Sequence, residues 1–181
     1  MFNLSTQDVV SSIKNTPLVN LDGILYQEYE NFFGNTFKLQ SLANKRFVKL
    51  ESQESLPRLR LDYKDDLMKN INVFFMNTRL TSILSKKFKT QLKFSSADIW
   101  VDNHGYYLQP HTDDKRIKIA LQIYLGNDNI GTSLYKNQHI VKTFDFKFNC
   151  GYALLNNEKS LHGLKSPVEN DGRISLYVRY S

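Results

Sequence analysis

The second half of the chain, from about Ala97 onward, is a series of short extended segments separated by turn-forming residues. The turns contain Asn, Asp and Gly, which favour tight connections between strands. The expected strands are 97–102, 106–111, 117–125, 131–135, 139–146, 151–155, 161–165 and 173–180. About eight strands at this spacing are typical of a sandwich, a barrel or a jelly roll. We therefore predict a mainly β core.

Two of these strands alternate between apolar and polar side chains. Their polar faces carry Lys118, Ala120, Gln122 and Tyr124 in the first strand and Arg173, Ser175, Tyr177 and Arg179 in the last. In a simple sandwich these polar faces would meet water. In a barrel with helices outside, the apolar faces pack on the helices and the polar faces line a cavity. We favour the second arrangement, because the long helix expected over 70–88 needs an apolar partner.

The N-terminal half supplies helices, so we predict a mainly β protein with N-terminal helices (α+β). Residues 5–15 begin with the spacing of a capping box and predict a first helix. Asp22 can cap a second helix, which Gly34 ends. The longest helix is expected over about 70–88, where apolar residues recur at helical spacing.

Two further strands are expected in this half, at 47–50 and 57–63. In the second one, Arg58 and Arg60 share a face because side chains alternate along a strand. We expect this face to be solvated, and contact with a substrate anion is the alternative.

Length and composition fit one domain. A chain of 181 residues with 41% hydrophobic content can bury a full core. We expect 1–181 to form a single domain in which 1–95 supports a core formed by 96–181. The net charge of +6 is mild and spread along the chain. A lysine-rich surface is the favoured interpretation, and a nucleic-acid footprint is the alternative.

The single cysteine, Cys150, excludes an internal disulfide and indicates a reducing compartment. Its position at the start of an apolar strand predicts a buried, inert thiol. The first residues lack the regions of a signal peptide, and no apolar run reaches membrane-spanning length. These observations predict a cytoplasmic protein without a membrane partner.

The stretch 106–113 contains His111 and Asp113, two residues apart. In an extended strand such residues point to the same side, so an imidazole and a carboxylate converge. Together with a second histidine they would form the 2-His-1-carboxylate triad that binds Fe(II). His162 is the candidate for that second histidine, whereas His104 and His139 lie at turns and are not expected to be ligands.

The order His111, Asp113, His162 and then Arg173, eleven residues after His162, resembles the Fe(II)/2-oxoglutarate-dependent dioxygenases, especially their prolyl-4-hydroxylase-like branch. The resemblance covers roughly 99–180. Arg173 to Ser175 also resembles an Arg-x-Ser signature of some members, and the segment beginning at Tyr124 resembles a Tyr-Leu-Asn segment of the family. Residues 131–134 resemble a Gly-Gly-x-Leu motif that has lost its second glycine, so no function is carried onto them.

This resemblance implies a double-stranded β-helix (jelly-roll, cupin-like) catalytic core. It implies that Fe(II) is held by the two histidines and the aspartate, and that 2-oxoglutarate and O2 are cosubstrates. The distal carboxylate of 2-oxoglutarate would pair with Arg173, because a guanidinium gives a bidentate fork. The remaining candidate contacts to the cosubstrate are Tyr124, Ser175 and Tyr107. Hydroxylation would accompany decarboxylation to succinate and CO2, with ascorbate as a candidate reductant.

Two alternatives stay open. An oxidative nucleic-acid demethylase shares the triad, and Arg173 and Arg179 resemble the paired arginines of that group. A catalytically silent metal-binding or sugar-binding jelly roll is the other. Asp113 argues against a halogenase, because halogenases lack this carboxylate. The primary substrate is left open between a protein side chain, prolyl or other, and a small molecule.

Overall fold

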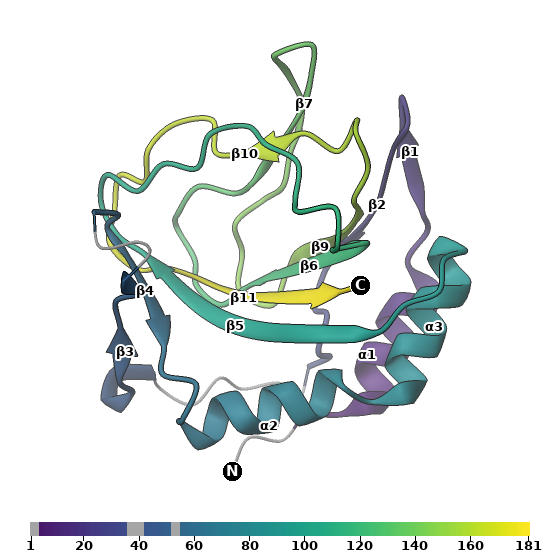
Figure 1. Ribbon diagram of the computed structural model, residues 1–181, viewed down its shortest axis with the longest axis horizontal. Helices are drawn as coiled ribbons and strands as arrows, with labels where there is room; N and C mark the ends of the chain where they lie inside the picture. The colour runs from purple at the N-terminus through teal and green to yellow at the C-terminus, as the bar shows by residue number, and fades with distance from the viewer. Residues whose placement is uncertain (1–3, 36–41, 52–54) are drawn as a thin grey trace.

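A large antiparallel sheet forms the centre of the fold in the computed structural model, which describes residues 4–35, 42–51 and 55–181. Within these residues eight strands follow the order β1-β2-β9-β6-β11-β5-β4-β3, and a smaller sheet has the order β10-β7-β8. The strands are β1 Val19–Leu21, β2 Ile24–Tyr29, β3 Phe47–Val48, β4 Arg58–Leu61, β5 Phe94–Asp102, β6 Ile119–Tyr124, β7 Ser133–Lys136, β8 His139–Thr143, β9 Gly151–Leu155, β10 His162–Gly163 and β11 Arg173–Tyr180. Figure 1 shows the large sheet curving beneath the smaller one.

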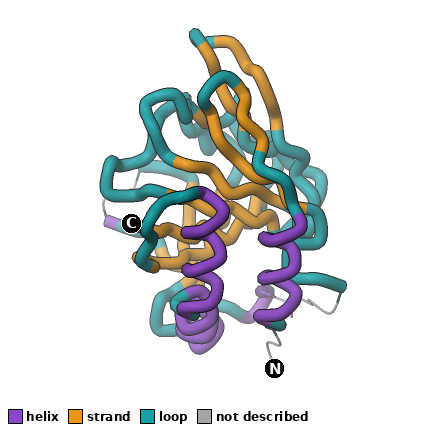
Figure 2. The backbone as a smooth tube through the Cα atoms, turned by 90° about the vertical axis from the view of Figure 1, so that its right-hand side faces the viewer, coloured by secondary structure: helices purple, strands orange, loops and turns teal. Residues whose placement is uncertain are grey.

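Helices cover the outer face of the large sheet. They are α1 Thr6–Asn15, α2 Asp66–Phe75 and α3 Thr78–Phe88, with a short 3-10 helix, η1, at Leu42–Asn44. Figure 2 shows α1 and α3 side by side. The apolar face of β6, with Ile119, Leu121 and Ile123, lies in one core cluster with residues of all three α-helices. The predicted arrangement, with helices packed on the apolar faces, is therefore confirmed.

A second cluster fills part of the space between the two sheets. It contains Tyr124 from β6, Tyr152 from β9 and Leu134 from β7. Phe144 stacks on Tyr152 with ring centroids 4.1 Å apart. A polar cavity lies beside this aromatic cluster, along β4, β5 and β11, where the polar faces of the strands point inward.

The long helix expected over 70–88 is wrong, because the structure has two helices there. Asn77 interrupts the segment, and its side-chain oxygen accepts a hydrogen bond from the backbone N–H of Arg79 at 2.9 Å. An N-cap of this kind begins a new helix. α2 packs through Leu67, Ile71 and Phe75, so Val73 and Met76 of the predicted stripe face outward and are 69% and 58% exposed. Apolar spacing alone did not reveal the interruption.

The helix expected to begin at Asp22 is also wrong. Asp22 and Gly23 form the turn of a β1–β2 hairpin, with φ angles of 55° and 94°. Positive φ at both positions is what a type I′ turn needs, and Asp-Gly is a preferred pair for it. β2 then pairs with β9, so it joins the large sheet.

Buried Gln27 fastens this hairpin to the end of α1. Its side-chain nitrogen donates to the carbonyl oxygens of Ile13 and Thr16, at 3.1 and 2.6 Å. Its side-chain oxygen accepts a hydrogen bond from the Tyr29 hydroxyl at 2.6 Å. All of these groups would lose a buried partner without the amide.

Smaller differences concern strand limits. Residues 106–111 form no regular strand, and His111 alone makes an isolated bridge, with His162. Pro110 has no N–H to donate to a strand ladder.

The thiol of Cys150, which was predicted to be buried, is only half-buried and lies immediately before β9. The large sheet includes strands from both 1–95 and 96–181, and the division into a support and a core stays a prediction. No helix in the described ranges is long and apolar enough to span a membrane.

We predict that Gln27→Leu lowers the free energy of unfolding by about 1–3 kcal/mol, because it leaves buried hydrogen-bonding groups without a partner. Chemical denaturation monitored by circular dichroism measures this change. Gln91→Leu is the control, since Gln91 is exposed. Equal stability of the two variants would contradict the role given to Gln27.

Candidate active site

The backbone brings the two predicted histidine ligands together. The N–H of His111 donates to the carbonyl of His162 at 2.9 Å, and the N–H of His162 donates back to the carbonyl of His111 at 2.8 Å. Gly163 makes this close pairing possible, because a Cβ there would lie 2.7 Å from the carbonyl oxygen of Leu108. The reciprocal pair fixes the separation of the two imidazoles.

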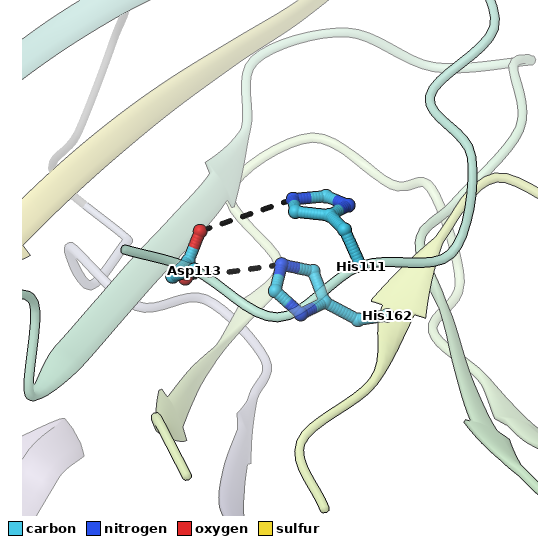
Figure 3. Close-up of side chains that lie close together, drawn as sticks. All are labelled: His111, Asp113 and His162. Carbon is cyan, nitrogen blue, oxygen red and sulfur yellow. Dashed lines mark ion pairs between the residues drawn. The ribbon is translucent and has the colours of Figure 1, made fainter. Parts of the chain in front are cut away.

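Asp113 faces both rings, as Figure 3 shows. Its Oδ1 lies 3.9 Å from Nε2 of His111, and its Oδ2 lies 3.8 Å from Nε2 of His162. The ligand atoms of the three residues all lie within 4.8 Å of one another. The structure therefore brings the three residues predicted from the sequence together in one cluster.

The tautomers of both histidines suit metal binding. Nδ1 of His111 lies 2.9 Å from the carbonyl oxygen of Gln109, and Nδ1 of His162 lies 2.9 Å from that of Ser160. A carbonyl only accepts, so each Nδ1 carries the proton and each Nε2 keeps its lone pair. Burial lowers the pKa of His162 below its usual value, against the opposing charge of Asp113, so the neutral ring is favoured.

The carboxylate of Asp113 is only half satisfied. Its Oδ1 accepts a hydrogen bond from the Tyr177 hydroxyl at 2.9 Å. Burial, and then the charge of Asp113, raise the pKa of Tyr177, so the phenol stays protonated and donates. Oδ2 is buried without a hydrogen-bond partner among the described residues. Such an orphan oxygen is costly, and a cation facing the two free Nε2 atoms would satisfy it. Two imidazoles and one carboxylate fit Fe(II).

The triad borders a cavity of about 220 Å³. Arg173 also lines it and is 2% exposed. Its Nη1 donates to Asp102 at 2.6 Å, its Nε to the carbonyl of Ile130 at 2.7 Å, and its Nη2 to the Thr132 hydroxyl at 3.3 Å. The guanidinium is thus held firmly at the wall of the cavity.

Asp102, fully buried on β5, is a functional candidate that sequence reasoning missed. It contacts Arg173 on β11 and also lies 2.7 Å from Nε of Arg58 on β4. The expectation of a solvated arginine face at Arg58 is wrong: its guanidinium lies over the rings of Trp100 and Tyr106, 4.2 and 4.7 Å from their centroids. The available signal was the matching alternation of Asp on β5 with Arg on its two neighbours.

The other three predicted cosubstrate residues lie less directly on the cavity. Tyr124 is fully buried, and its hydroxyl accepts a hydrogen bond from the N–H of Thr132 at 2.9 Å. Ser175 is buried and accepts a hydrogen bond from the side-chain nitrogen of Gln122 at 3.1 Å. Tyr107 is 39% exposed, and among the described residues Tyr106, not Tyr107, lines the cavity. Their roles stay predictions.

No protein-family model and no curated protein matches this chain. Solved structures do match it in fold. An oxidoreductase of the 2OG-Fe(II) oxygenase family from Burkholderia pseudomallei has 13% identity and a TM-score of 0.54, over 98% of this chain and 79% of that one. AviO1 from Streptomyces viridochromogenes has 9% identity and a TM-score of 0.53, over 100% and 96%.

A prolyl hydroxylase from Trichoplax adhaerens, in complex with a peptide fragment of the hypoxia inducible factor oxygen degradation domain, has 12% identity and a TM-score of 0.56, over 96% of this chain and 87% of that one. The chain therefore has the fold of the 2OG-Fe(II) oxygenases and prolyl hydroxylases. This likeness confirms the predicted double-stranded β-helix core with helices outside it.

We predict that His111→Ala, Asp113→Ala and His162→Ala each abolish stoichiometric Fe(II) binding, because each removes one of three converging ligands. Iron content after anaerobic loading and desalting measures the loss. His104→Ala and His139→Ala serve as controls and should retain iron. Iron retained by His162→Ala but lost from a control would show that the triad is misassigned.

Proposed function

We propose that this protein is an Fe(II)- and 2-oxoglutarate-dependent dioxygenase that hydroxylates a protein side chain or a small molecule. The observation that carries the proposal is the orphan Oδ2 of Asp113, whose carboxylate faces two unprotonated Nε2 atoms in a cavity that Arg173 also lines. A catalytically silent metal-binding jelly roll could use the same orphan oxygen, but it would not need the buried cation of Arg173 beside it.

When bound, Fe(II) with 2-oxoglutarate and O2 supplies the oxidising chemistry, in which 2-oxoglutarate is converted to succinate and CO2. His111, Asp113 and His162 would hold the metal, with Tyr177 fixing the orientation of the Asp113 carboxylate through its hydrogen bond. Arg173 would form charge-assisted hydrogen bonds with the distal carboxylate of 2-oxoglutarate.

The walls of the cavity support the same chemistry. Trp100, Tyr106 and Leu164 line it with apolar surface, which excludes water. The Thr132 hydroxyl donates to the side-chain oxygen of Gln122 at 2.9 Å and offers a further polar group near Arg173. The reducing cytoplasm is the compartment that we propose, on the basis of the single cysteine.

We predict that the purified protein with Fe(II) forms succinate slowly from 2-oxoglutarate without an added substrate. Arg173→Gln should raise the KM for 2-oxoglutarate about ten- to a hundredfold, because it removes a charge-assisted contact worth about 1.5–3 kcal/mol. Mass spectrometry of succinate measures both effects. Arg79→Gln, on the exposed part of α3, is the matched control. Absence of 2-oxoglutarate binding in the wild-type protein would refute the proposal.

A nucleic-acid demethylase is the second candidate, because Arg173 and Arg179 both line the cavity. If the +6 charge is only a surface property, binding to random single-stranded DNA should be weak and should vanish near physiological salt. Fluorescence anisotropy at several salt concentrations measures this. Tight binding with a steep salt dependence, or turnover of methylated oligonucleotides, would place the demethylase first.

A further inference from the structure

The inner face of β4, β5 and β11 carries two groups in which an aspartate lies between two arginines. The inner triplet consists of Arg58, Asp102 and Arg173, whose ion pairs measure 2.7 and 2.6 Å. It holds the guanidinium that we assign to the cosubstrate. Two cations and one anion leave this triplet with one positive charge, which suits a single carboxylate.

The outer triplet repeats this arrangement with Arg60, Asp98 and Arg179. Nη2 of Arg179 lies 2.5 Å from one oxygen of Asp98, and Nη1 of Arg60 lies 3.5 Å from the other. The Nε atoms of Arg60 and Arg179 are buried and lack hydrogen-bond partners among the described residues. This triplet therefore has one uncompensated positive charge and two unused donors.

The outer triplet is close to the metal site but separate from the inner triplet. Arg179 lines the same cavity as His111 and Asp113. Its guanidinium carbon lies 5.7 Å from the ring centroid of Tyr177, whose hydroxyl donates to Asp113. Asp98 and Asp102 are four residues apart on one strand, or about 13 Å. One carboxylate cannot contact both triplets.

Charge balance indicates what the outer triplet would bind. In the proposed enzyme the two charges of Fe(II) offset those of the 2-oxoglutarate dianion. The charge of Asp113 offsets the excess charge of the inner triplet. The positive charge of the outer triplet is then left over at the wall of the cavity, where the side chain of Arg179 is 33% exposed and open to a bound anion.

We propose that the outer triplet binds an anionic group of the primary substrate, a carboxylate or a phosphate-like oxyanion, and so selects acidic substrates. This inference rests on the proposed function. Arg179 would donate to the anion from the cavity wall, while Asp98 holds Arg179 against Arg60. A substrate anchored at Arg179 would reach the metal past Tyr177, which lies two residues earlier on the same strand face.

Crystals of the protein loaded with Mn(II) and 2-oxoglutarate, soaked with sodium selenate or with 4-bromobenzoate, test the proposal. Selenate represents the phosphate-like group and 4-bromobenzoate the carboxylate, and both scatter anomalously. We expect a peak within hydrogen-bonding distance of Arg179 with at least one of them. Arg179→Gln and Arg60→Gln should abolish or weaken the peak, whereas Arg179→Lys, which keeps the charge, should partly retain it.

The matched control is Arg46→Gln, because Arg46 and Arg60 both line a neighbouring surface groove, outside the cavity. The peak should survive this change. No peak at Arg179 in the wild-type protein, a peak that persists in a folded Arg179→Gln variant, or a peak that depends on Arg46 would each overturn the proposal. Circular dichroism establishes that each variant is folded.

The outcome is separable from that of the proposed function. Wild-type protein that converts 2-oxoglutarate but shows no anion at Arg179 would refute only the acidic-substrate inference. Wild-type protein that binds selenate at Arg179 but binds no 2-oxoglutarate would refute the dioxygenase assignment. A parallel screen of N-acetyl amino acids against their C-terminal amides should show stronger succinate formation with the free acids.

Discussion

The reciprocal backbone pair between His111 and His162 is the interaction on which the candidate site depends. It joins the segment between β5 and β6, two strands of the large sheet, to β10 of the smaller sheet. The candidate metal site therefore lies where the two sheets meet. The two imidazoles take their positions from backbone hydrogen bonds rather than from flexible side-chain contacts. Asp113, two residues beyond His111, then has little freedom in its distance from either ring. Rigid placement of this kind is what a three-ligand metal site requires.

The sequence predicted the regular strands and the three residues that cluster at the candidate metal site. The alternation of β6 and β11 correctly indicated which face meets the helices and which lines a cavity. The sequence did not distinguish a helix from a hairpin at Asp22, because helix capping and turn formation favour the same residue types. The interruption at Asn77 escaped for a related reason, since the apolar spacing continues across it.

The electrostatic arrangement of the cavity was beyond the reach of sequence patterns. Asp102 and Arg58 are 44 residues apart in the chain, and their pairing follows from strand order rather than from spacing. Only the order β11-β5-β4 places an aspartate strand between two arginine strands. Burial of Asp102 and Arg173 then makes the balance of charge matter, because salt screens buried charges less than exposed ones.

The pairing of β2 with β9 has a consequence for the order in which the protein folds. Tyr29 lies opposite Gly151, so this contact cannot form on the ribosome until the chain has been synthesised beyond Gly151. Until then, β2 presents an unpaired edge and buries little of its apolar surface. Contacts between such distant residues also slow folding in general, because a long loop must close before they form. We therefore expect the N-terminal hairpin to join the sheet late in folding, and unpaired β2 would be open to aggregation until it does.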